Sequence, residues 1–161
     1  MEILEIKDKL TTQPVGLSPS SLYETDFYQW TLHNAELLRQ GRFSEIDTEN
    51  MAEEIENLGG NNKRELLHRL VILIMHLLKW QYQPERRSRS WKSTVVAQRE
   101  NIDSLLEQSP SLRYGIETVI AKALVKAGKQ FEAETGISRK VLPGACPYTF
   151  EQIMDDEFWP D

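Results

Sequence analysis

Four polar residues fall within or beside the apolar stripes of predicted helices, and they are the first candidates for chemistry. Asn34, Glu54, Gln98 and Arg99 come from three helical segments whose other inward positions are apolar. Because a buried charge without a partner is costly, the simplest arrangement is an ion pair between Glu54 and Arg99. Such a cluster either fixes how the helices pack or lines a pocket. In a pocket, these groups and the imidazole of His76 would bind a ligand or transfer protons.

A basic, aromatic segment at residues 79–92 (KWQYQPERRSRSWK) is the second candidate. Its only acidic residue is Glu85, so its local charge is +4 against a total of −6, and the remainder of the chain carries −10. The basic residues are Lys79, Arg86, Arg87, Arg89 and Lys92. Arginines bind phosphate in a bidentate manner, and exposed Trp80 or Trp91 rings would stack on bases, which favours single-stranded nucleic acid or a phosphate ligand.

The same segment supports two other interpretations. Trp80 and Trp91 lie at helix ends, where aromatic rings often close a core, and the acidic remainder weakens attraction to a polyanion. The segment would then pair with acidic stretches of this chain, at 53–56 or 155–157, or with a protein partner. Nucleic-acid binding is therefore an alternative rather than the favoured interpretation.

Metal and nucleophile patterns are incomplete. Glu65 and His68 have the E-x-x-H spacing of di-iron bundles, but no second copy of the motif follows. His68 and His76 are eight residues apart on one predicted helix, about 12 Å along its axis, too far to share an ion easily. Cys146 has no nearby base and is interpreted as a buried thiol, and no glycine-rich phosphate loop is present. We therefore expect no metal, no cofactor and no catalytic residue.

Helical periodicity defines the elements that must position these residues. Long helices are predicted at 26–40, 47–59, 61–82, 90–108 and 110–134, and a short one after Thr149. Gly41 and the pair Gly59-Gly60 are predicted stops, and Thr149 with Gln152 has capping-box spacing. The helix at 61–82 is apolar over most of its circumference and should be the core element; His76 and Lys79 lie on its narrow polar face.

These elements predict an all-α fold, a single up-and-down bundle of about five long helices plus a short C-terminal helix. The bundle should cover residues 23–161, after a loosely ordered N-terminal arm at residues 1–22. The longest apolar run, residues 70–78, is far shorter than the roughly 20 residues of a membrane span. With one cysteine and no export signal, we expect a cytoplasmic protein that does not associate with membranes.

Several motifs in a fixed order resemble a known family. They are YQWTLHNAELLRQGRF, DTENMAEEIENLG, HLLKWQYQPERRSRSW, QRENI, SPSL and CPYTFEQIMDDEFWP, spread over about residues 23–160. Together they resemble the family known as "domain of unknown function 29", which is plentiful in cyanobacteria. The resemblance implies a helical-bundle fold, and it implies no activity.

The favoured function is therefore a non-enzymatic module that binds a protein partner or itself. Phe158 and Trp159 lie among acidic residues near the C-terminus, which suggests a docking peptide, or else a tail folded back on the bundle. Two other classes stay open. One is nucleic-acid or phosphate binding through residues 79–92, and the other is an enzyme with a polar pocket around Glu54, His76 and Arg99.

Overall fold

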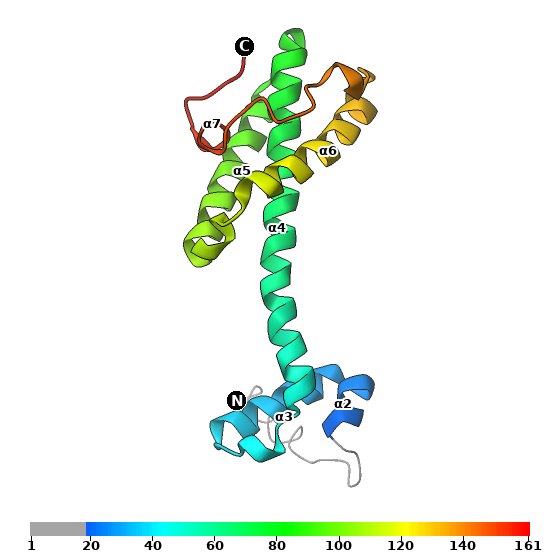
Figure 1. Cartoon of the computed structure of the whole chain (residues 1–161), viewed down its shortest axis with the longest axis vertical. Helices are drawn as coiled ribbons and strands as arrows, with labels where there is room; N and C mark the ends of the chain where they lie inside the picture. The colour runs from blue at the N-terminus through cyan, green and yellow to red at the C-terminus, as the bar shows by residue number, and fades with distance from the viewer. Residues whose placement is uncertain (1–18) are drawn as a thin grey trace. The chain divides into compact units, whose positions relative to one another are not determined.

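The computed structural model describes residues 19–161, and within that range the fold is all-helical, without a strand (Figure 1). This confirms the predicted fold class. The expected N-terminal arm falls largely on residues 1–18, outside the described part. Its last residues belong instead to the helix α2, Pro19–Thr25, where Leu22 is buried.

The chain divides into two compact units, the first ending at Gly59 and the second beginning at Gly60. That residues 23–161 form a single domain stays a prediction.

The first unit is built from α2, from α3 (Phe27–Arg39) and from the beginning of α4 (Thr48–Tyr82). The side chain of Asp26 caps α3 by accepting a hydrogen bond from the backbone N–H of Gln29 at 3.0 Å. Gly41, with φ of +70°, ends the helical segment in a conformation that favours glycine. A short 3₁₀ helix, Phe43–Glu45, lies in the connection to α4.

The predicted break at Gly59-Gly60 is wrong, because α4 is one continuous helix of 35 residues. Neither glycine adopts the left-handed conformation that would end a helix. A glycine inside a helix costs only about 1 kcal/mol, and neither flank contains a proline, so the hydrogen-bond ladder continues through the pair. The described part of the chain therefore has four long helices, α3 to α6, rather than five.

The second unit contains the rest of α4 together with α5 (Arg89–Gln108), α6 (Ile116–Thr135) and α7 (Phe150–Met154). In Figure 1, α5 runs alongside α4 and α6 crosses it. Three 3₁₀ helices connect these elements: Pro84–Arg86, Pro110–Arg113 and Arg139–Val141. All four α-helical elements contribute to one apolar core, from Leu66 to Ile153, as expected for a layer of helices that buries its apolar stripes.

Helix starts in the second unit follow the sequence closely but not completely. The capping box of Thr149 and Gln152 is confirmed, with both reciprocal hydrogen bonds present. Ser88 caps α5, in place of the expected Ser90. Pro110 begins a 3₁₀ helix rather than α6, which starts after Gly115 in a left-handed conformation with φ of +71°.

Candidate functional sites

A groove lies between α3 and the beginning of α4 in the first unit. Its volume is about 360 Å³. Seven of its ten lining residues are apolar, and the complete set is Phe27, Trp30, Thr31, Asn34, Ala35, Leu38, Met51, Glu54, Ile55 and Leu58. The lining of the groove is therefore mainly apolar surface, and it has few polar groups that could take part in a reaction.

Large apolar side chains on the walls of the groove are exposed to solvent. Phe27, Leu38, Ile55 and Leu58 are 49%, 45%, 62% and 66% exposed. Their spacing places these residues on the apolar stripes of the two helices, where burial is expected, but none of the four is buried. Only Trp30 among the lining apolar residues is fully covered, at 3% exposed. The apolar stripes of both helices are real, but within the described residues little covers them.

Glu54, the single charged residue of the groove, already has a hydrogen-bond partner in its own unit. The hydroxyl of Tyr23 donates to its Oε1 at 2.6 Å. This hydrogen bond, helped by burial and by repulsion from nearby carboxylates, raises the pKa of Tyr23 to about 12. The phenol therefore keeps its proton at neutral pH and goes on donating it to Glu54. No local sequence pattern marks Tyr23 as a residue of this site.

A polar network fixes the floor of the groove. Asn34, only 1% exposed, donates from Nδ2 to the carbonyl of Trp30 at 3.0 Å and accepts at Oδ1 from the backbone N–H of Asp47 at 3.0 Å. The indole Nε1 of Trp30 donates to Oδ2 of Asp47 at 2.9 Å. Although burial acts to raise it, hydrogen bonds from Asn50 and Trp30 hold the pKa of Asp47 below its usual value. The network anchors the start of α4 to α3.

Arg99 in the second unit is buried, but its partners are backbone carbonyl groups. Its Nε donates to the carbonyl of Ile153 at 2.8 Å, one terminal nitrogen to that of Phe158 at 2.9 Å, and the other to that of Asp156 at 3.4 Å. Burial lowers the pKa of Arg99, while the nearby acidic residues oppose this effect. Backbone carbonyls thus take the place of the carboxylate of Glu54 that the sequence analysis expected as its partner.

These bonds hold the C-terminal segment, residues 153–160, in place. Aromatic and cationic side chains pack on the same segment. The rings of Trp80 and Trp159 pack with centroids 4.6 Å apart. Nζ of Lys92 lies 5.8 Å from the first ring and 5.4 Å from the second. The guanidinium of Arg87 lies 5.0 Å from the Trp80 ring and donates to the carbonyls of Trp80 and Pro160. Phe158 and Trp159 therefore belong to a tail that is folded back, which was the alternative to a docking peptide.

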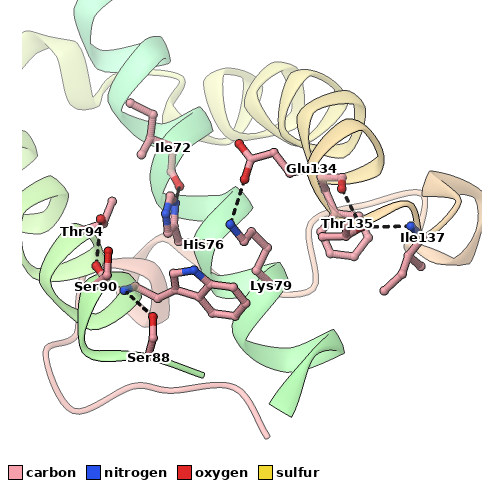
Figure 2. A network of polar contacts seen from close by, with 11 residues as sticks. Ile72, His76, Lys79, Ser88, Ser90, Thr94, Glu134, Thr135 and Ile137 are labelled. Atoms are coloured by element: carbon pink, nitrogen blue, oxygen red, sulfur yellow. Dashed lines mark hydrogen bonds and ion pairs between the residues drawn. The ribbon is translucent and has the colours of Figure 1, made fainter. Parts of the chain in front are cut away.

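The other basic side chains of residues 79–92 are either exposed to solvent or in contact with residues of this chain. Arg86 and Arg89 are exposed to solvent. Lys79 is buried, forms an ion pair with Glu134 at 2.8 Å and places its Nζ 4.5 Å from the ring of Trp91 (Figure 2). Both tryptophans of the segment therefore already face cations of this chain.

His76 lies one turn before Lys79 on α4 and is half-buried (Figure 2). Its Nδ1 is 2.9 Å from the carbonyl of Ile72, so this nitrogen carries the proton and donates it. Burial lowers the pKa of His76, and the charge of Lys79 lowers it further, although the Ile72 carbonyl and Glu134 oppose both effects. The imidazole is held in its neutral form in a single orientation.

Cys146 is half-buried. Burial raises the pKa of the Cys146 thiol, which disfavours the nucleophilic thiolate. No group of three or more His, Cys, Asp and Glu side chains in this range is placed to hold a metal ion. None of the described helices is both long enough and apolar enough to cross a membrane.

The described residues thus define an all-helical protein with a solvent-open apolar groove and a clamped C-terminal segment. The family model "Domain of unknown function DUF29" matches residues 22–159. The chain belongs to this family, as its motifs had indicated. Searches of the curated proteins and of the solved structures found no significant match.

Proposed function

We propose that this protein is a non-enzymatic interaction module of the cytoplasm that binds another polypeptide through the groove between α3 and α4. The observation that carries the proposal is the exposure of four large apolar side chains around one hollow. Water contact of apolar surface costs about 25 cal/mol per Å², so covering this surface would stabilise a complex. Contiguous apolar surface on a helical protein is typical of binding sites for partner chains.

The large exposed apolar residues of the second unit come from four separate elements. They are Val96 of α5, Tyr114 of the loop before α6, Val125 of α6 and Val141 of a 3₁₀ helix. Single exposed apolar side chains are normal on any protein and need no partner. Four exposed side chains of the first unit, in contrast, line one groove.

The other candidate sites support an interaction module rather than an enzyme. A catalytic pocket that used Arg99 would need access to its guanidinium, which is 1% exposed and donates to three carbonyls. The aromatic residues of the C-terminal segment are likewise engaged within the chain, so they do not supply a docking peptide. Among the candidate sites in residues 19–161, the groove is the one that leaves large apolar side chains exposed around a hollow.

A matched pair of substitutions tests the proposal. Ile55 and Val125 are both β-branched, both lie within helices and are both 62% exposed, but only Ile55 lines the groove. The wild-type chain, Ile55→Asp and Val125→Asp are each immobilised and exposed to an extract of the native host, and the retained proteins are quantified by mass spectrometry.

We expect at least one protein to be retained by the wild type and by Val125→Asp, and to be reduced about tenfold or more by Ile55→Asp, as for a residue at the centre of an interface. If the three chains retain the same proteins in the same amounts, the groove is not a binding site and the proposal is wrong. Circular dichroism of each chain checks that helix content is unchanged.

A further inference from the structure

We infer that the groove is occupied by the same groove of a second copy of this chain, so that the first unit forms a two-fold symmetric homodimer. This inference rests on the proposed function and names the partner. It follows from the small core of the first unit, from the area of its exposed apolar surface and from the distribution of its charges.

The described residues of the first unit bury few apolar side chains. Among its described residues, only Leu22, Trp30 and Leu37 are buried apolar side chains, whereas the apolar core cluster of the second unit has 21 members. Isolated helices of this length are marginal in water, and helical stability in proteins comes mainly from packing of an apolar face. A second copy would provide that packing for α3 and for the beginning of α4.

The exposed area is sufficient for a dimer. Phe27, Leu38, Ile55 and Leu58 around the groove are between 45% and 66% exposed, and Ala35 and Met51 of the same lining are partly exposed. Aromatic side chains bury roughly 150–250 Å² each and aliphatic ones somewhat less, so this lining exposes on the order of 500 Å². Two such surfaces together give about 1,000 Å², the least that a specific interface normally buries.

The charges of α4 point away from the groove. Glu49, Glu53 and Glu56 lie about half a turn around the helix from Met51 and are exposed, so they would remain in water when two grooves meet. The carboxylate in the groove, Glu54, already accepts the Tyr23 hydroxyl. A cationic partner would find no other carboxylate among the lining residues, whereas a second apolar groove is complementary to the first.

The symmetry of this arrangement is simple. In a two-fold interface the same surface is used twice, and each residue contact occurs in both directions. Two grooves, each made by a pair of helices, would bring four helices together around a shared apolar centre, which is the architecture of a four-helix bundle. The acidic outer faces of α4 would form the outside of this bundle.

Sedimentation velocity of the full chain over a dilution series, from roughly 100 μM to roughly 0.1 μM, tests the inference, because this range covers the dissociation constants of moderate dimers. The wild type and Val125→Asp should show the same monomer–dimer equilibrium, within about twofold. Ile55→Asp should weaken the dimer about tenfold or more. Leu58→Gln, which replaces an exposed side chain with another good helix former, should also weaken it with little effect on folding.

The remaining outcomes overturn the inference. A wild type that is monomeric at every concentration excludes the homodimer; if host proteins are still lost from Ile55→Asp, the proposed function survives with a different partner. A dimer that is weakened by Val125→Asp but not by Ile55→Asp or Leu58→Gln has its interface elsewhere. A monomer in which Leu4→Asp accelerates hydrogen exchange in α3 would assign the groove to the first residues of the same chain.

Discussion

The two units of this protein use polar residues in their interiors in different ways. In the second unit, Arg99 is buried and donates its hydrogen bonds to backbone carbonyls more than fifty positions later in the sequence. In the first unit, Asn34 and Asp47 join two neighbouring elements beneath a groove that stays open. Among the described residues, the second unit has 21 buried apolar side chains in one core cluster, whereas the first unit has three. The proposed partner would cover the apolar surface that the described residues of the first unit leave exposed.

Removal of the guanidinium of Arg99 should have the largest effect. Arg99→Met keeps the apolar stem but leaves three carbonyl acceptors without their donor, and we expect a loss of about 3 kcal/mol in the free energy of unfolding. Urea unfolding followed by circular dichroism measures this loss. Arg86→Met, at an exposed position, is the control and should change stability by less than about 0.5 kcal/mol.

Hydrogen exchange provides a second readout for Arg99. Amides of residues 155–159 should exchange faster in Arg99→Met, while amides of α3 should be unaffected. If the C-terminal segment stayed equally protected, the clamp would not be what holds it.

Substitution of Asn34 tests the first unit in the same way. Asn34→Ala leaves a buried carbonyl of Trp30 and the N–H of Asp47 without a side-chain partner, so we expect local opening of α3 to become easier by about 2 kcal/mol. Hydrogen exchange of the α3 amides measures this change.

Asn101 supplies the control for Asn34. Its Nδ2 donates to the carbonyl four residues earlier, as that of Asn34 does, but it is exposed on α5. Asn101→Ala should therefore change exchange in its own helix by less than about 0.5 kcal/mol. Equal effects of the two substitutions would contradict the role of burial.

Replacement of Gly59 should stabilise the protein slightly. A Cβ atom at this position would meet nothing within 4 Å, and the backbone is helical, so Gly59→Ala should strengthen α4 by up to about 1 kcal/mol. Hydrogen exchange around residue 59 measures the gain. Gly115→Ala, at a φ of +71°, is the contrasting control and should destabilise the chain. A loss at Gly59 would show that something closely approaches this glycine.

The stability of the second unit should depend on pH through His76. In the unfolded chain the imidazole takes up a proton near the ordinary pKa of 6.5, whereas burial lowers the pKa in the folded chain. The unfolded state therefore binds more protons as the pH falls, and stability that is complete above about pH 6.5 is lost below it. Urea unfolding at neutral and mildly acidic pH measures this decline.

His76→Asn keeps a donor near the Ile72 carbonyl but cannot titrate, so it should flatten the decline. His68→Asn, at an exposed position on the same helix, should leave the decline as in the wild type. A decline that survives in His76→Asn would belong to other groups.

Local patterns predicted the helices well, because capping and periodicity are properties of neighbouring residues. The capping box at Thr149 and the stop at Gly41 are examples. The stop at Gly59-Gly60 failed because a small cost in propensity does not end a helix whose flanks are favourable. Sequence spacing reports a conformational preference but not whether that preference prevails.

The candidate sites were less predictable, because a sequence does not reveal what covers a surface. The spacing of Met51, Ile55 and Leu58 identified an apolar face but not its exposure. Spacing placed Arg99 at the edge of an apolar stripe, but its partners could not be inferred, since every residue has a carbonyl and none of the three acceptors is marked by its side chain. The hydrogen bond from Tyr23 to Glu54 joins residues 31 positions apart and leaves no local pattern.

The clamp formed by Arg99 also bears on how this segment tolerates sequence change. Because the guanidinium donates to carbonyl oxygens, its hydrogen bond to residue 156 does not depend on the side chain there, and even proline would retain the acceptor. A substitution at this exposed position should therefore leave the path of the chain unchanged. A saturation library at Asp156 should be largely neutral for folding, whereas one at Arg99 should permit almost no substitution.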